Sequence, residues 1–82
     1  MTTLTEVWVA IQYINYEGEA LYGLYPTYES AYSAVNSDSL YAKHLTEKGP
    51  SGIPENGSVT FEYDDGSWNF VRYTANEILR ED

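Results

Sequence analysis

The sequence predicts one α+β domain, in which an antiparallel sheet of about four strands carries one or two short helices on one face. Apolar residues alternate in two separate regions, each interrupted by a turn, which is the pattern of two β-hairpins. Between these regions the apolar spacing becomes helical. The 82 residues provide for one hydrophobic core, so we treat 1–82 as a single domain in the order β-β-α-(α)-β-β.

The first hairpin is predicted over residues 6–25. Residues 6–14 form its first strand, because apolar side chains occupy alternate positions on one face and several positions on the other. A strand with two partly apolar faces belongs in the centre of a sheet. A turn follows over 15–19, with Gly18 at the left-handed position, and residues 20–25 return as the second strand.

A capped helix is predicted to follow this hairpin. Pro26 ends the strand, Thr27 is a suitable N-cap, and Glu29 in the first turn interacts favourably with the helix dipole. Residues 28–35 have helical apolar spacing. A second, weaker helix is expected over 40–48, where a glycine and a proline stop it.

The second hairpin is predicted after a flexible loop at residues 49–57, which contains three glycines and two prolines. Residues 58–64 alternate as a strand, and Asp65-Gly66 favours a type I′ turn. That turn would place Tyr63 opposite Trp68. One face of this hairpin is apolar and the other polar, as in a sheet with one face on a core. The tail from Thr74 fits a capping box before a short helix, and a strand end at this point is the alternative.

The charge of the chain is strongly negative and unevenly distributed. Thirteen acidic side chains against four basic ones give a formal net charge of -9. No Lys or Arg precedes Lys43, and none occurs from Gly49 to Val71, so both predicted hairpins are acidic. Such a chain attracts cationic partners and repels nucleic acid and anionic membranes. We therefore expect no direct nucleic-acid binding and no membrane binding.

The sequence shows no constellation that would support catalysis. Cysteine is absent, which excludes disulfides and thiolate chemistry. A catalytic triad around His44 would have to use Ser39 and Asp38, whose spacing fixes no geometry, so His44 is expected to be either solvated or at the edge of the core. The Asp64-Asp65-Gly66 stretch lacks the remaining ligand positions of a calcium loop. We expect a non-enzymatic protein without a cofactor or metal ion.

Targeting signals are also missing from the sequence. No apolar run approaches the roughly 20 residues of a membrane span. Residues 1–10 lack the basic and apolar regions of a signal peptide. The expected location is therefore the cytoplasm, that of the host cell if the protein is viral.

The nine tyrosines suggest a binding surface. A small core has few hydrogen-bond partners for phenol hydroxyls, so several tyrosines should lie on the surface. Tyrosine is frequent at interface hot spots, although it also fits half-buried strands. We take Tyr16 and Tyr22 as candidate aromatic anchors.

Carboxylates in the predicted hairpins complete the candidate site. Alternate residues of a strand lie about 6.6 Å apart, a spacing comparable to that of phosphates along one nucleic-acid strand. A cationic groove that binds nucleic acid would bind such a face too, although a solvated acidic surface or adaptation to high salt gives the same composition. The predicted partner-binding residues are Glu17, Glu19, Glu62, Asp64, Asp65, Tyr16 and Tyr22.

A local pattern in the first part of the chain is familiar. Val7-Trp8-Val9-Ala10-Ile11 leads to the turn at Gly18, and the segment GLYPTYESA at 23–31 is a strand that ends in a capped helix. Over about the first 35 residues this resembles small phage and bacterial proteins of unknown function. The size, acidity and lack of catalytic groups are similar in type to phage-encoded anti-CRISPR and anti-restriction proteins. The resemblance carries over no functional residue.

The composition and this resemblance lead to two hypotheses. The first is a non-enzymatic protein that inhibits a host nucleic-acid-handling defence complex of the kind targeted by anti-CRISPR or anti-restriction proteins. It would block a cationic surface of that complex, and one way to do so is to mimic a nucleic acid. The alternative is a small acidic assembly subunit that homodimerises through a sheet edge or a tyrosine patch.

Overall fold

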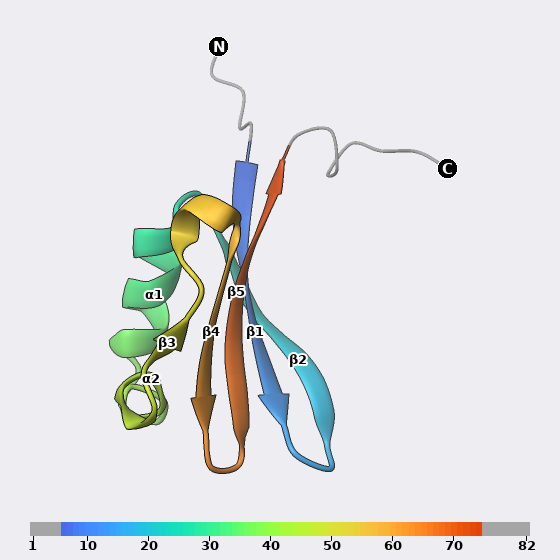
Figure 1. Ribbon diagram of the computed structural model, residues 1–82, viewed down its shortest axis with the longest axis vertical. Helices are drawn as coiled ribbons and strands as arrows, with labels where there is room; N and C mark the ends of the chain where they lie inside the picture. The colour runs from blue at the N-terminus through green and yellow to red at the C-terminus, as the bar shows by residue number, and fades with distance from the viewer. Residues whose placement is uncertain (1–5, 75–82) are drawn as a thin grey trace.

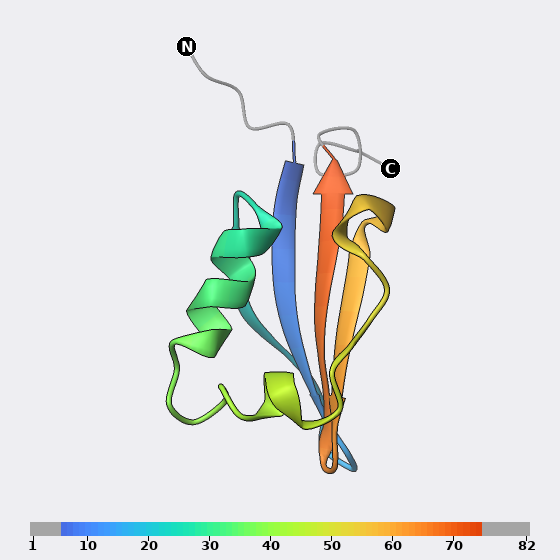
Figure 2. The same ribbon diagram turned by 60° about the vertical axis from the view of Figure 1, so that its left-hand side comes forward.

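The computed structural model describes residues 6–74 and contains one antiparallel sheet of five strands in the order β2-β1-β5-β4-β3 (Figure 1). The strands are β1 (Glu6–Ile14), β2 (Gly18–Tyr25), β3 (Pro50–Ser51), β4 (Ser58–Tyr63) and β5 (Gly66–Thr74). Helices α1 (Tyr28–Asn36) and α2 (His44–Glu47) lie on the same side of the sheet (Figure 2). The α+β class, the two hairpins and their order are confirmed, with five strands in place of about four.

The central position predicted for β1 is confirmed. β1 lies between β2 and β5 and is antiparallel to both. It therefore connects the two hairpins into one sheet. Within residues 6–74, no helix has the length and apolar character needed to cross a bilayer.

The segment 49–57, predicted as a flexible loop, contains regular structure. Pro50 and Ser51 form β3, which pairs with β4, and a 3₁₀ turn, η1 (Pro54–Asn56), follows. A proline in a strand is tolerated because β3 is at the sheet edge, where its missing N–H breaks no ladder. A strand of two residues has no periodicity, which is why the sequence gives no sign of it.

The second helix is shorter than predicted. Residues 40–48 were expected to be helical, but α2 is a single turn over His44–Glu47. The preceding chain turns around Asp38, whose side chain accepts the Leu40 N–H at 3.0 Å. Its carbonyl oxygen accepts the N–H groups of Tyr41 and Ala42. Local bonding by an aspartate competes with a regular helix, as is typical of turns.

The second hairpin has a different register from the predicted one. Its turn is Asp64-Asp65, so Phe61 pairs with Trp68 and Tyr63 pairs with Gly66. Gly66 is the first residue of β5. The position requires glycine because a Cβ there would collide with the backbone carbonyl oxygen of Tyr13. The shift is of two residues, which leaves every side chain on its predicted face.

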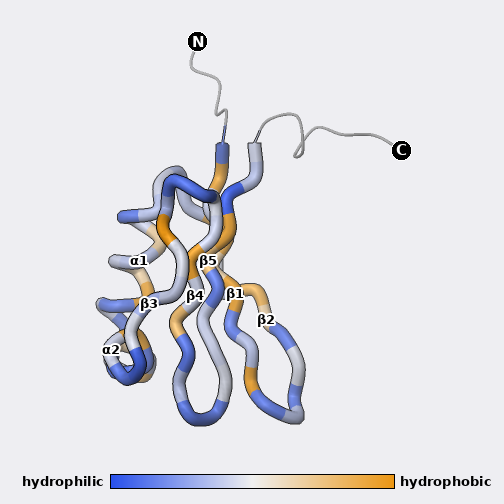
Figure 3. The backbone as a smooth tube through the Cα atoms, viewed as in Figure 1, coloured by the Kyte–Doolittle hydropathy of each residue, from blue (hydrophilic) through white to orange (hydrophobic). Residues whose placement is uncertain are grey.

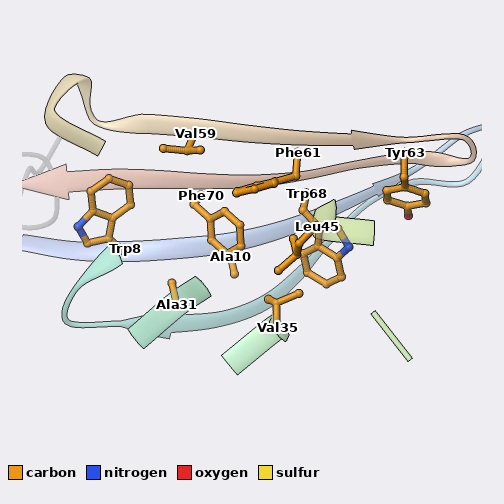
Figure 4. Close-up of a cluster of buried hydrophobic side chains, with 10 residues drawn as sticks. All are labelled: Trp8, Ala10, Ala31, Val35, Leu45, Val59, Phe61, Tyr63, Trp68 and Phe70. Atoms are coloured by element: carbon orange, nitrogen blue, oxygen red, sulfur yellow. The ribbon is translucent and has the colours of Figure 1, made fainter. Parts of the chain in front are cut away.

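The core forms between the helices and the apolar face of the sheet (Figure 4). The Thr27 cap is confirmed, since its Oγ1 accepts the Ser30 N–H at 3.1 Å. Trp68 and Phe70 are fully buried at the centre. The buried cluster consists of Trp8, Ala10, Ala31, Val35, Leu45, Val59, Phe61, Tyr63, Trp68 and Phe70. The predicted helix start after Thr74 lies outside the described residues.

Candidate functional site

The turns of the two hairpins meet at one end of the sheet (Figure 1). The Asn15 N–H donates to the carbonyl oxygen of Asp65 at 2.8 Å, and Ile14 pairs with Gly66 beside it. The residues of both turns are mostly hydrophilic (Figure 3). This geometry gathers six of the seven predicted site residues into one region, which we call the acidic end: Tyr16, Glu17, Glu19, Glu62, Asp64 and Asp65.

All six residues of the acidic end are exposed. Tyr16 projects from the β1–β2 turn with a relative accessibility of 103%, and its φ of 70° is in the left-handed region. Gly18 has a φ of 96°, as predicted for this turn. A non-glycine residue rarely adopts such a φ, and the tight turn that requires it directs the Tyr16 ring into solvent.

The carboxylates of the acidic end are poorly neutralised. Lys48 Nζ lies 3.7 Å from Asp64 Oδ1, and both side chains are more than half exposed, so this pair contributes little. Glu47 accepts the backbone N–H of Asp64 at 2.9 Å, which brings a further carboxylate to the same region. The acidic end is thus strongly negative.

A small hollow lies between the two turns. Its volume is about 270 Å³, and it is open to solvent. Ligand pockets usually span roughly 300–1,000 Å³, so this hollow suits a single side chain of a partner better than a small-molecule substrate. A carboxylate and tyrosine rings attract a cation such as Lys or Arg. The lining residues are Tyr13, Asn15, Glu62, Tyr63, Gly66 and Ser67.

Tyr22, the seventh predicted site residue, lies elsewhere. It is the unpaired residue of a bulge in β2, since Ala10 pairs with Gly23 and Ile11 with Leu21. The bulge turns the Tyr22 ring toward the core, edge-on to Trp68 with centroids 5.2 Å apart. Its hydroxyl donates to Asp38 Oδ2 at 3.0 Å. Tyr22 therefore links β2 to the turn after α1 through this hydrogen bond. It is not part of the acidic end.

His44 is half-buried between α2 and the sheet rather than solvated. Its ring stacks on Tyr63 with centroids 3.8 Å apart, and Nδ1 accepts the Nε1–H of Trp68 at 3.2 Å. Burial lowers the pKa of His44, and Lys43 lowers it further, while Glu47 and Asp65 oppose the shift. Asp38, the candidate triad acid, bonds to Tyr22 and Leu40 instead. These contacts give His44 a structural role.

The His44 contact predicts that moderate acid destabilises the protein. The folded-state pKa is depressed, so the contribution of His44 is complete above its unfolded pKa of about 6.5 and declines as the pH falls below that value. Thermal unfolding between pH 7.5 and pH 5.5 measures the loss. In His44→Gln, whose side chain does not titrate, the dependence should be weaker. An identical dependence in both proteins would show that His44 contributes nothing.

One feature that the sequence hypotheses did not use is the sheet face opposite the helices, which we call the open face. Eight apolar side chains alternate onto it, from β1, β2 and β5. The alternation in β1 was visible in the sequence, but it was interpreted only as a sign of a central strand. The residues are Val7, Val9, Ile11, Tyr13, Leu21, Leu24, Val71 and Tyr73.

Comparison with known proteins provides no relative. No protein-family model matches the chain, and neither the comparison with curated proteins nor that with solved structures gives a match. Within the described part of the chain, no group of three or more His, Asp or Glu side chains could hold a metal ion.

Proposed function

We propose that this protein is a non-enzymatic binding protein whose acidic end occupies the cationic, nucleic-acid-binding surface of a host defence complex. The observation that carries this proposal is the junction of the two acidic turns through the Asn15–Asp65 hydrogen bond. The junction holds carboxylates from two hairpins at fixed relative positions, and preorganised groups bind with less loss of conformational freedom.

The electrostatics of the acidic end favour such a partner. Like charges held close together repel one another, which weakens the isolated fold. A cationic surface removes this repulsion on binding, and it also steers the encounter over long range. A groove that normally binds phosphates is cationic, so it would both relieve this repulsion and attract the acidic end from a distance. In binding there, the carboxylates would take the place of nucleic-acid phosphates.

Two features give the contact specificity beyond charge. The hollow beside Glu62 fits one Lys or Arg side chain of the partner, which would approach the exposed ring of Tyr13. Tyr16 adds a large exposed ring at the rim. Tyrosine is enriched among hot-spot residues, so this ring would add binding energy where the partner covers it.

Charge reversal at the acidic end tests the proposal. The triple variant Glu62→Lys, Asp64→Lys, Asp65→Lys should lose binding by at least about 100-fold, because each buried charge pair that is broken typically costs 2–5 kcal/mol. The measurement is capture of a nucleic-acid-handling complex from a bacterial host lysate, with release by an added oligonucleotide and by salt.

A matched control separates the acidic end from net charge alone. Glu6→Lys, Glu29→Lys, Glu55→Lys makes the same change in charge away from both turns and should bind like the unmodified protein. Equal binding by both triple variants, each with an intact circular dichroism spectrum, would refute the proposal. Capture that an oligonucleotide does not compete with would refute the mimicry.

A further inference from the structure

The open face carries a continuous apolar surface in register across three strands. Val9 of β1 pairs with Leu24 of β2 on one side and with Val71 of β5 on the other. One row closer to the acidic end, Ile11 pairs with Leu21. Cross-strand neighbours with the same orientation lie about 5 Å apart, so these side chains touch one another and form a single patch.

This patch is unusually exposed for its chemistry. Leu21 and Leu24 have relative accessibilities of 64% and 60%, and Tyr13 and Tyr73 have 37% and 41%. Both helices lie on the other side of the sheet (Figure 2). Contiguous apolar patches of more than a few hundred Å² mark interaction sites on soluble proteins.

Three polar side chains of the open face are hydrogen-bonded to one another. Thr60 Oγ1 donates to Asn69 Oδ1 at 2.9 Å, and Asn69 Nδ2 donates to Ser67 Oγ at 3.3 Å. A row of polar side chains that satisfy one another is buried at lower cost than a row that depends on water. The face is therefore suited to being covered by another apolar surface.

The charge pattern of the open face selects its partner. In a chain of net charge -9, the carboxylates that the strand registers place on this face are Glu19 and Glu62, both at the acidic end. A surface so poor in charge resembles the interface of a homodimer, whereas interfaces between independent partners are about as polar as the rest of the surface.

We propose that two copies of this chain pack open face to open face. The four long strands cover roughly 500 Å² in projection, and protruding side chains raise the accessible area toward the roughly 800 Å² per partner of a standard interface. The result is a sandwich of two sheets about 10 Å apart.

Electrostatics fix the direction of the pairing. A two-fold axis parallel to the strands would bring both acidic ends together, which repulsion opposes. A two-fold axis across the strands places them at opposite ends of the dimer, about 25 Å apart and beyond the Debye length of about 8 Å at physiological salt. Each dimer then presents an acidic end at both tips.

Sedimentation equilibrium between about 1 and 200 µM tests the dimer. The unmodified protein should change from the 9.3 kDa chain mass to twice that mass as its concentration rises. Val9→Thr, Leu24→Thr, Val71→Thr places β-branched threonine, which suits strands, at all three positions but makes the central row polar, and it should remain monomeric throughout. The matched control is Leu40→Thr, Ile53→Thr, which removes exposed apolar side chains outside the strands and should dimerise normally.

Cross-linking tests the direction. The chain has no cysteine, so a single one can be introduced and treated with a short bis-maleimide. Val9→Cys lies at the middle of the face and should cross-link, whereas Tyr13→Cys at the acidic end should not. Monomeric unmodified protein at 200 µM, or a dimer that persists in the threonine variant, would overturn the proposal. Efficient cross-linking through Tyr13→Cys would overturn the antiparallel arrangement.

Discussion

Trp68→Ala is expected to remove a large part of the free energy of unfolding of the protein at 25 °C. Trp68 is fully buried, its ring packs against Tyr22 and Tyr41, and its Nε1–H donates to His44. Removing a buried tryptophan side chain costs about 3–5 kcal/mol. A domain of this length has a total stability of roughly 4–12 kcal/mol at about 0.05–0.15 kcal/mol per residue, so one substitution removes a large part of it.

Urea unfolding followed by circular dichroism at a fixed protein concentration measures this effect. Trp68→Phe keeps a ring in the core but loses the hydrogen bond to His44, so its cost should be clearly smaller. Leu40→Ala changes an exposed side chain and should stay within about 0.5 kcal/mol of the unmodified protein. A Trp68→Ala protein less than 1 kcal/mol below the unmodified one would contradict the packing described here.

The strand and helix assignments were predictable where periodicity was strong. β1 and β4 have clear alternation, and Thr27 is a strong helix-capping signal, so these elements and the apolar face of the second hairpin were identified correctly. β3 was missed because two residues carry no pattern. The register of the β4–β5 hairpin was wrong because Gly66 was assigned to the turn, whereas it is needed within β5 by the approach of another strand.

The candidate site was predictable in composition but not in geometry. The carboxylates of the two hairpins could be named from the sequence. Their gathering at one end of the sheet depends on the pairing of β1 with β5, which brings together residues far apart in the chain. Tyr22 was misplaced for a related reason. A bulge reverses the direction of a side chain, and no local pattern in β2 distinguishes a bulged tyrosine from a regular one.

The acidic end and the open face support one another if both proposals hold. An acidic end repels its own copy, so a dimer interface is favoured on a part of the surface that is poor in charge, which is the open face away from Glu19 and Glu62. A dimer with an acidic end at each tip could engage two cationic surfaces at once, and linked sites raise the apparent affinity without new contacts. Binding by the threonine variant of the open face would then be weaker but not lost, whereas charge reversal at the acidic end removes it.

Gly66→Ala is expected to destabilise the fold by at least about 2 kcal/mol, within the cost typical of overpacking. The added methyl group would meet the Tyr13 carbonyl oxygen and would lie 3.1 Å from the Ile14 Cα, and backbone atoms cannot rotate out of the way. The φ of Gly66 is not in the left-handed region, so alanine suffers no backbone strain there. The loss then reports the contact, reduced by the smaller conformational entropy that alanine gives the unfolded chain.

Gly18→Ala is the matched comparison for this effect. Gly18 has a φ of 96° and open space around its Cα, so alanine there costs only the backbone strain, on the order of 1 kcal/mol. Urea unfolding of both variants gives the difference, and hydrogen exchange of the Asn15 amide reports whether the turns stay joined. Faster exchange in Gly66→Ala alone is the expected result, because the Asn15–Asp65 bond lies next to the displaced strand pair. Equal stability and exchange in the two variants would show that the acidic end does not depend on this close approach of β5 to β1.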